Sequence, residues 1–480
     1  MFSFIYYNIK TKKIALFRDR FGIKPLNYTF INNNIYAASE IKPLLHLRKK
    51  KNLKNNKITK DSIINFLYRA RINHDKFTFF ENIYSILPGH YLLFNLKNNK
   101  YIDKRYYFFK KKKNPKKLEN ILKKKIDLYS ITRRKSGVLL SGGVDSTLLS
   151  AMIKKKRSNI LSFTYGFSGK SDKDLSLVDD VDSSKQISKE LNIKNYHTLV
   201  DPQFIIKNFD KILKIIESPF TSIRIFGIYK VYELAKSKGY SMIIDGQGGD
   251  EVFAGYKHHM NYSNKNFSAK NMKKILTNNL DNSVLKDGSN FLFENLFSKK
   301  LLNFKKSYKN TLWVKNFNNN FKNYSLLQNS QLEDIFLNTI PRSLHYVDRL
   351  SMINNIEARL PLLDNDIVDY GLNLPDNIKS DNIQSRKIIK NILKKYISQP
   401  VDIKKYVADP QAIWMRTYLK KFILNDFNSY FFKENKLFNS SEVKKAYFNF
   451  LNGSNKIPSY TFFTIFCLNR FMKLFKIKVD

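Results

Sequence analysis

Two short loops rich in glycine, serine and acidic residues carry the side chains best suited to chemistry. The first, residues 140–146, reads LSGGVDS and lies between an apolar run and an amphipathic run. Gly142 and Gly143 have no Cβ, so their backbone can adopt unusual dihedral angles and its N–H groups can approach a phosphate closely. The hydroxyls of Ser141 and Ser146 add donors, and a helix beginning here would point the positive end of its dipole at the same anion. We interpret this loop as a binding site for the phosphates of ATP.

The acidic residue of this loop, Asp145, would repel a bare phosphate, so we interpret it as a magnesium ligand. The second loop, residues 245–251, reads DGQGGDE and repeats the pattern of a strand, close glycines and acids that open a helix. One such loop can be a tight turn with an N-cap, but two at neighbouring strand ends are hard to explain structurally. We therefore expect Asp145 and Asp250 to hold one Mg²⁺ that bridges ATP phosphates.

The elements that must position these loops alternate between helix and strand from Leu118 onward. The predicted elements are a helix over 118–131, a strand over 138–140, a helix over 147–155, a strand over 160–165, a helix over 181–191, a strand over 196–199, a helix over 228–237 and a strand over 242–244. This order predicts an α/β domain with a doubly wound parallel sheet. Ligands of such sheets bind outside the carboxyl ends of the strands, where both loops begin. Residues 258–330 are predicted to form a helical insertion, and the domain extends over 118–480.

Residues 1–110 instead resemble successive hairpins. Short β-rich runs at 2–7 and 14–17, at 28–30 and 35–37, and at 91–96 and 101–102 are separated by turn residues. The pattern predicts an antiparallel β domain. Residues 111–117 are rich in lysine, contain a proline and lack apolar periodicity, which predicts a linker.

The composition is strongly basic, with 85 Lys and Arg against 40 Asp and Glu and a net charge of +45. Such charge attracts nucleic acid or anionic membranes. The lysines are scattered, however, in a chain that is also rich in Asn, Ile, Phe and Tyr, which is what A+T-rich codons produce. We therefore favour codon bias over a nucleic-acid surface. Neither a signal-like start nor an apolar run long enough to span a membrane is present.

A single cysteine, Cys467, excludes a disulfide within the chain and a thiolate-rich metal site. Its apolar surroundings predict a small buried residue. These features fit a reducing cytoplasm.

The loops also belong to a longer series of motifs that resembles the asparagine synthetase family. The matching pieces are RDRFGIKPL at 18–26, ASEIK at 38–42, LPGH at 87–90, SGGVDS at 141–146, DGQGGDE at 245–251, FAGY at 253–256, LHYVDR at 344–349, SM at 351–352 and EARLPLLD at 357–364. Members of this family join a class II, Ntn-type glutaminase sandwich to an ATP-pyrophosphatase synthetase domain. The resemblance implies an ATP-dependent carbon–nitrogen ligase. Aspartate attacks the α-phosphorus of ATP, pyrophosphate leaves, and ammonia converts β-aspartyl-AMP to asparagine.

The same resemblance implies roles for individual residues. Adenine and ribose would lie against Leu139, Leu140 and Tyr165. The pyrophosphate portion would be held by Ser141, Gly142, Gly143, Asp145 and Ser146. The AMP portion would contact Asp245 and Gly246. The aspartate end would be shaped by Glu251, Arg349 and Glu357. Catalytic roles would fall to Gln247 and Lys404, with Lys405 as the alternative pyrophosphate contact. Substrates would be aspartate and ammonia or glutamine; a homodimer is left open.

Three positions depart from the family pattern. Gln247 stands where well-studied members have a glutamate, and an amide can hydrogen-bond an intermediate but accepts a proton poorly. The segment around Lys404 lacks the usual glycine–phenylalanine pair. Phe2 stands where a glutaminase of this family needs an N-terminal cysteine nucleophile. The opening residues match the middle of that domain, so we expect a partial glutaminase that cannot hydrolyse glutamine unless the missing half is supplied.

This last departure leaves several origins open. Translation could begin upstream, another chain could supply the missing half, or the gene could be decaying. A half-sandwich would expose an unpaired strand edge and an apolar face, which predicts that residues 1–110 are unstable or adhesive without a partner.

Alternative functions remain at this point. An ATP pyrophosphatase that modifies tRNA would share the first loop and would give meaning to the charge of +45. The segments at 18–26 and 351–364 argue against it. A relative that amidates a different carboxylate fits every motif, because substrate choice depends on pocket side chains. A non-catalytic remnant is disfavoured because both loops keep their glycines and acids.

Overall fold

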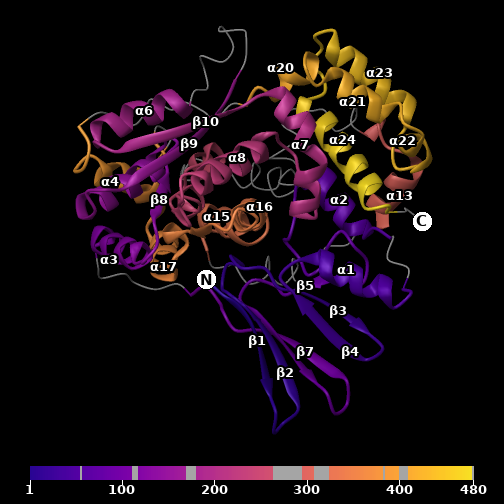
Figure 1. Cartoon of the computed structure of the whole chain (residues 1–480), viewed down its shortest axis with the longest axis horizontal. Helices are drawn as coiled ribbons and strands as arrows, with labels where there is room; N and C mark the ends of the chain where they lie inside the picture. Colours follow the sequence, from indigo (N-terminus) through magenta and orange to yellow (C-terminus); the bar gives the residue numbers. More distant parts are fainter. Residues whose placement is uncertain are drawn as a thin grey trace.

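The computed structural model of the chain describes residues 1–53, 57–110, 117–168, 180–262, 294–307, 324–381, 384–398 and 409–477. It places an N-terminal β lobe beneath a larger lobe that holds a parallel sheet and most of the helices (Figure 1). The predicted linker at 111–117 lies, apart from Lys117, outside the described residues. Much of the predicted insertion at 258–330 does so as well.

The larger lobe is built on five parallel strands in the order β10-β9-β8-β11-β12. Their bounds are β8 Ser136–Leu139, β9 Leu161–Phe167, β10 Lys194–Val200, β11 Met242–Ile244 and β12 Glu357–Arg359. Interior strand β11, between β8 and β12, is buried at every position because helices cover both faces of the sheet, as parallel sheets require. The predicted doubly wound α/β fold is thus confirmed.

The helices around this sheet follow the predicted alternation. They are α3 Leu118–Ser130, α4 Val144–Lys156, α6 Asp180–Glu190, α7 Pro202–Ile216 and α8 Arg224–Ser237. Helix α4 starts three residues before the predicted start because Gly143, in an extended conformation, is its N-cap. Helix α7 was not predicted; Asp201 caps it by accepting a hydrogen bond from the Phe204 N–H at 2.8 Å.

The remaining described part of this lobe is mainly helical, as expected. After β11 the helices are α9 Gly249–Val252, α10 Lys257–Tyr262, α13 Lys299–Ser307, α15 Leu326–Phe336, α16 Thr339–Met352, α17 Asn365–Asn373, α18 Asp376–Lys379, α19 Lys387–Leu393, α20 Gln411–Arg416, α21 Lys420–Phe427, α22 Tyr430–Glu434, α23 Ser440–Leu451 and α24 Ser459–Leu474. No described helix is long and apolar enough to cross a lipid bilayer.

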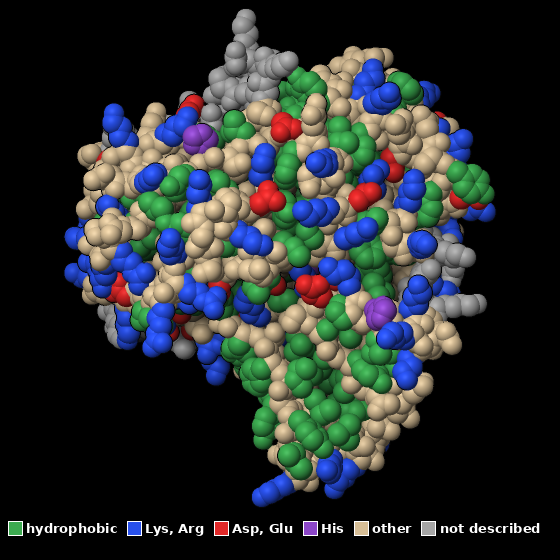
Figure 2. All heavy atoms as spheres, viewed as in Figure 1, with side chains coloured by type: hydrophobic (Ala, Val, Ile, Leu, Met, Phe, Trp, Pro, Cys, Tyr) green, Lys and Arg blue, Asp and Glu red, His purple; other side chains and the backbone are tan. Residues whose placement is uncertain are grey.

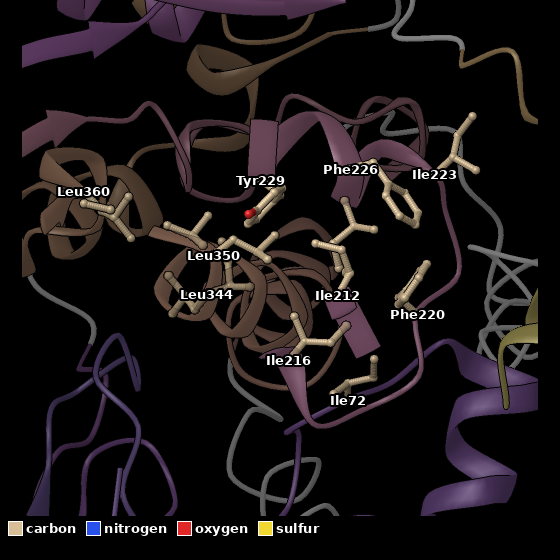
Figure 3. Packing of buried hydrophobic residues seen from close by; sticks show 14 of the residues in the cluster. Ile72, Ile212, Ile216, Phe220, Ile223, Phe226, Tyr229, Leu344, Leu350 and Leu360 are labelled. Carbon is tan, nitrogen blue, oxygen red and sulfur yellow. The ribbon is translucent and has the colours of Figure 1, made fainter. Parts of the chain in front are cut away.

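The core of this lobe lies where α7, α8 and α16 meet (Figure 3). Ile212 and Ile216 of α7, Phe226 of α8 and Leu350 of α16 are fully buried there. Burying such side chains contributes about 1.5–3 kcal/mol each relative to exposing them. The contact holds α8 against β9 and β10 and α16 against β12, the strands on either side of the pair that carries the two loops.

The N-terminal lobe contains two antiparallel sheets, as the hairpin pattern predicts. One has the order β1-β2-β6-β7 and the other the order β4-β3-β5. The strands are β1 Ser3–Asn8, β2 Lys13–Arg18, β3 Asn27–Ile31, β4 Asn34–Ala38, β5 Tyr84–Ser85, β6 His90–Asn95 and β7 Lys100–Arg105. The expectation of hairpins throughout was incomplete, because helices α1 (Ile41–Lys50) and α2 (Lys60–Arg69) separate β4 from β5.

Aromatic side chains remain in solvent on the outer strand of the larger N-terminal sheet. Phe4, Ile5, Tyr6 and Tyr7 of edge strand β1 are 44–55% exposed. Figure 2 shows hydrophobic side chains gathered over this lobe, with few charges among them. Edge strand β1 therefore presents an exposed apolar surface.

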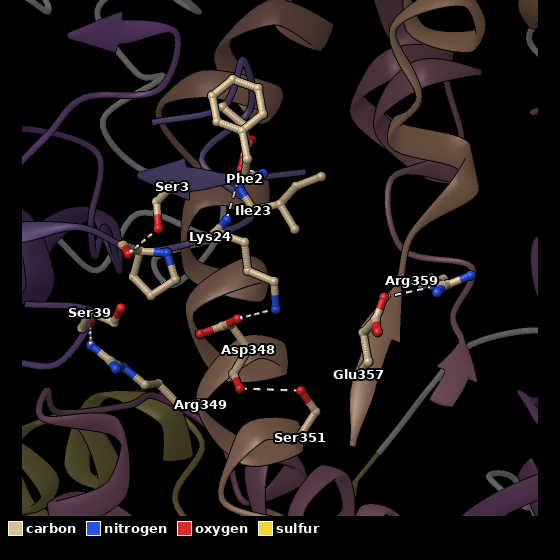
Figure 4. Close-up of polar contacts among 12 residues, drawn as sticks. Phe2, Ser3, Ile23, Lys24, Ser39, Asp348, Arg349, Ser351, Glu357 and Arg359 are labelled. Carbon is tan, nitrogen blue, oxygen red and sulfur yellow. Dashed lines mark hydrogen bonds and ion pairs between the residues drawn. The ribbon is translucent and has the colours of Figure 1, made fainter. Parts of the chain in front are cut away.

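A buried carboxylate joins the two lobes. Glu217, which follows α7, accepts hydrogen bonds from the backbone N–H groups of Ile41 (2.8 Å) and Lys42 (2.6 Å) at the start of α1. It also pairs with Arg349 of α16 at 3.1 Å. A second link joins Lys24 Nζ to Asp348 at 2.8 Å (Figure 4). The junction therefore rests on charge-assisted contacts, one end of which is a helix N-terminus.

Candidate active site

The two glycine-rich loops lie side by side because the strands before them are neighbours. Strands β8 and β11 pair in parallel, with Ile244 opposite Val138. Loop 1 (residues 140–146) and loop 2 (residues 245–251) therefore leave the same edge of the sheet at its carboxyl ends, where ligands of such sheets bind.

Loop 1 is held in shape by its own serines. The Ser146 hydroxyl donates to the Gly143 carbonyl at 3.1 Å and accepts from the Ser141 N–H at 3.2 Å. The two serine hydroxyls lie 3.1 Å apart. Gly142 has a φ of +73°, and a Cβ there would lie 2.5 Å from Cβ of Ser183. The loop is thus a rigid turn at the start of α4, which suits an anion-binding loop.

Loop 2 packs directly on loop 1 through glycines. A Cβ added to Gly249 would lie 2.4 Å from Cγ of Asp145, and one added to Gly246 would lie 3.3 Å from the Ser146 nitrogen. Gly248 has a φ of +96°, the left-handed region that favours glycine. Residues without a Cβ are required here so that the two loops can touch.

Arg386 lies between the acidic residues of the two loops. Its Nη1 contacts Asp145 Oδ2 and Asp250 Oδ1, each at 2.8 Å. Burial opposes the charged form, but the two carboxylates outweigh this and raise the pKa of the guanidinium above its usual range. Sequence reasoning missed this residue. Its one signal was an arginine in a segment, 377–405, where the other cations are lysines.

The same geometry fits a divalent cation. One guanidinium nitrogen touches both carboxylates, so the two are close enough to share a single positive ion. Asp145 Oδ1 is buried and has no hydrogen-bond partner among the described residues. Carboxylate oxygens are the ligands that Mg²⁺ prefers. The predicted metal ligands are therefore brought together, with an arginine between them.

Two other acidic residues of loop 2, Asp245 and Glu251, are buried. Burial raises the pKa of Asp245 to about 6, against hydrogen bonds from the Gln247 and Gly246 backbone. Burial, together with nearby Asp250 and Asp334, raises the pKa of Glu251 to about 8. The Tyr256 hydroxyl donates to Glu251 at 2.6 Å. Glu251 is therefore largely protonated at neutral pH.

A polar network ties α10, which follows loop 2 in the chain, to α15. The imidazoles of His258 and His259 lie 2.9 and 3.0 Å from Asp334 Oδ2. Burial lowers the pKa of His259 to about 4. Burial also opposes ionisation of Asp334, but the two histidine hydrogen bonds outweigh it and hold the pKa of that carboxyl below its usual range. The network anchors α10 to α15.

The residues expected around adenine and ribose follow the neighbouring strands. Leu139 ends β8, and Leu140 is 1% exposed, with its carbonyl accepting a bond from the Thr164 hydroxyl at 2.5 Å. The ring of Tyr165 packs on Gly227 of α8, where an added Cβ would lie 2.1 Å from the ring. These side chains lie at or near the carboxyl ends of β8 and β9, on the side of the loops.

Two of the predicted residues, Arg349 and Glu357, are not brought into this cluster. Arg349 donates to the Ser39 carbonyl at 2.7 Å (Figure 4). It also pairs with Glu217 at the lobe junction. Glu357 is opposite Met242 at the amino end of β11 and pairs with Arg359 at 2.7 Å, whereas the loops follow carboxyl ends. Lys404 lies outside the described residues, as does Lys405.

Comparison with known proteins agrees with the two lobes. The sequence model of the asparagine synthase family matches residues 117–456, and that of the glutamine amidotransferase domain matches residues 1–107. No described structural feature conflicts with these ranges.

Individual relatives match over most of this chain. Asparagine synthetase [glutamine-hydrolyzing] 1 of Bacillus subtilis is 25% identical over 459 residues, which cover 88% of this chain and 70% of that protein. A putative asparagine synthetase [glutamine-hydrolyzing] 2 of Methanocaldococcus jannaschii is 28% identical over 271 residues, 54% of this chain and 50% of that protein. Asparagine synthetase [glutamine-hydrolyzing] 2 of B. subtilis is 24% identical over 426 residues, 82% of this chain and 53% of that protein. The matched region thus spans from half to 70% of these relatives.

Because the asparagine synthase model covers more than half of the sequence and is preceded by the amidotransferase match, the chain belongs to the asparagine synthase family of ATP-dependent ligases.

Proposed function

We propose that the chain amidates the side-chain carboxylate of aspartate through β-aspartyl-AMP, with ATP and ammonia as co-substrates. The observation that supports this proposal is the contact of loops 1 and 2, which brings the carboxylates of Asp145 and Asp250 to one guanidinium nitrogen of Arg386, beside the serine-lined turn of loop 1. A carboxylate and a triphosphate repel each other. Their reaction therefore needs positive charge and N–H donors at this place.

Different residues of the two loops would contact the phosphates, the AMP portion and the metal. Ser141, Gly142, Gly143 and Ser146 present hydroxyl and backbone donors to the β- and γ-phosphates. Asp245 and Gly246 lie toward the AMP portion, which Leu139, Leu140 and Tyr165 border. Asp145 and Asp250 would hold Mg²⁺, which supplies neutralisation of phosphate charge when bound.

The proposed reaction has two steps, and residues of loop 2 serve the second. The aspartate carboxylate forms a bond to the α-phosphorus while pyrophosphate leaves; ammonia then attacks the acyl carbon, AMP leaves and a proton is lost. Gln247 can hydrogen-bond the acyl-adenylate through its amide, and protonated Glu251 borders the acceptor without adding charge. Lys404 is the proposed pyrophosphate contact, with Lys405 as its alternative.

The experiment measures pyrophosphate, AMP and asparagine from ATP and Mg²⁺ with aspartate and ammonium. Parallel reactions replace aspartate by other dicarboxylic acids, by peptide carboxylates or by tRNA. We expect aspartate to stimulate pyrophosphate release, with asparagine and AMP formed in equal amounts. Asp145→Asn should abolish this, while the exposed Asp366→Asn, whose carboxylate pairs with Lys125, should not.

An absence of stimulation by aspartate would contradict the proposed acceptor. If another acid stimulated release and Asp145→Asn abolished it, the ATP chemistry would stand and the acceptor would change. If only tRNA did so, the amidation itself would be wrong.

A further inference from the structure

The guanidinium of Arg386 uses the oxygens that a bridging cation would need. Asp145 Oδ2 and Asp250 Oδ1 each lie 2.8 Å from the same Nη1 atom. The two carboxylates come from different loops, more than a hundred residues apart in sequence, and Arg386 comes from the start of α19. One positive group therefore joins three separate segments.

We propose that Arg386 acts as a built-in substitute for the metal ion. In the nucleotide-free enzyme it holds the two acids together and excludes divalent cations. It gives up the carboxylates when metal and nucleotide arrive together, and then pairs with the triphosphate. The assignment rests on the proposed function only in naming ATP as the nucleotide.

Electrostatics require such a substitute. Two carboxylates of separate loops repel each other, and Asp145 is 9% exposed. Leaving the buried Asp145 without a positive partner would be costly, whereas the Asp250 side chain is 36% exposed. The contact between Gly249 and Asp145 also fixes the loops so closely that the acids cannot move far apart.

The hydrogen bonds of the Arg386 guanidinium would also allow this group to leave the carboxylates and pair with phosphate. Among the described residues, its guanidinium pairs with the two carboxylates and with no other side chain, and its buried Nε has no hydrogen-bond partner. Its backbone has a φ of +53° directly before α19, so the side chain starts from a turn and not from within the helix. A planar guanidinium with unused donors matches phosphate oxygens as well as it matches carboxylates.

Because Arg386 would compete with the metal for the carboxylates, one substitution should change two affinities in opposite directions: that for metal alone and that for Mg²⁺–ATP. Removing the charge frees the acids for a metal alone, so Arg386→Gln should bind Mn²⁺ without nucleotide about tenfold more tightly than wild type, a change of ~1.4 kcal/mol. The same variant should bind Mg²⁺–ATP more weakly, because the charge that would face the triphosphate is lost. A residue with a purely structural role would weaken both.

The test measures Mn²⁺ binding by electron paramagnetic resonance and Mg²⁺–ATP binding by calorimetry for the full chain. Arg386→Lys keeps the positive charge but replaces the planar guanidinium with an ammonium group. Its affinities for Mn²⁺ and for Mg²⁺–ATP should fall between those of wild type and Arg386→Gln. Lys387→Ala, one residue further on and paired with Asp381, is the matched control and should change neither. Should the glutamine variant fail to fold by circular dichroism, Arg386→Lys carries the comparison.

Mn²⁺ affinity of Arg386→Gln equal to or below that of wild type would overturn the proposal, as would unchanged Mg²⁺–ATP affinity. Opposite shifts without aspartate-dependent pyrophosphate release would support the role of Arg386 and reject only the proposed acceptor. The two conclusions are therefore separable.

Discussion

Gly249 of loop 2 lies against Asp145 of loop 1, so closely that a Cβ at position 249 would fall 2.4 Å from Asp145 Cγ and 2.6 Å from its Oδ1. This contact joins the ends of two strands that are adjacent in the sheet. It makes the separation of the two predicted metal ligands depend on one missing methyl group.

Gly249→Ala should therefore push the loops apart and lower the rate of pyrophosphate formation on the order of a hundredfold, because a displacement of about 1 Å costs that much in a positioned site. Steady-state pyrophosphate release checks it. Gly239→Ala is the control: Gly239 has a φ of +77° but nothing within 4 Å of an added Cβ. That variant should lose some stability and keep its activity. Equal activity losses in the two variants would show that strain alone matters.

Titration of Glu251 should make the free energy of unfolding depend on pH. The unfolded chain releases this proton near the ordinary pKa of a glutamate, whereas burial keeps it on the folded chain up to a pKa of about 8. Between these values the folded state binds more protons, so the free energy of unfolding falls as pH rises.

Glu251→Gln removes the titrating group, so the free energy of unfolding no longer falls with pH at this site. Relative to wild type, the variant should gain stability on the order of 2 kcal/mol between pH ~5 and pH ~8.5. Denaturant unfolding at several pH values measures the difference, with exposed Glu434→Gln as the control. A constant difference between variant and wild type across this range would contradict the buried, protonated state.

The lobe junction should depend on Glu217. Removing one partner of a buried ion pair leaves the other charge unpaired, so Glu217→Ala should destabilise the chain by about 3 kcal/mol. Glu40 lies 3.9 Å from the same arginine but is 45% exposed, so Glu40→Ala should cost well under ~1 kcal/mol. Urea unfolding followed by circular dichroism compares them. Similar midpoints for the two variants would argue against a junction held by Glu217.

The single thiol of this sequence should not release ammonia from glutamine. Cys467 is 0% exposed in α24, its Sγ accepts a hydrogen bond from the Phe220 N–H, and burial raises the pKa of the thiol. Such a group is a poor nucleophile. We expect no glutamate from glutamine with this polypeptide, while ammonium supports product formation; glutamate release above that of Cys467→Ala would disprove it.

Local pattern was enough to find both loops. Gly142 and Gly249 stand in runs whose composition itself demands close backbone approach, and the strands before them are short, apolar and buried. Strand β12 was missed because Glu-Ala-Arg has little strand preference of its own. It is a strand because it pairs with β11, which is a tertiary effect.

Contacts between residues far apart in sequence explain the other features that the sequence did not predict. Arg386 meets Asp145 across 241 residues, and no local spacing encodes that approach. Helix α1 contains Pro43 and several lysines, so its sequence gave a weak helical signal. Its N-terminus is stabilised by Glu217 from the other lobe. Arg349 likewise was recognised as a motif residue, but its bonds to Ser39 and Glu217 appear only once the lobes are assembled.

The edge strand β1 reads SFIYYN and carries no charge, whereas the whole chain has a net charge of +45. Repulsion between two copies acts over the Debye length, about 30 Å at 0.01 M salt and about 8 Å at 0.15 M. Attraction between two uncharged aromatic edges acts only at contact. Low salt should therefore keep copies apart, and added salt should let these edges pair and raise the scattering mass, until Tyr6→Lys restores a charge to the strand. The colloidal behaviour of this basic protein is thus governed by an uncharged, exposed edge strand.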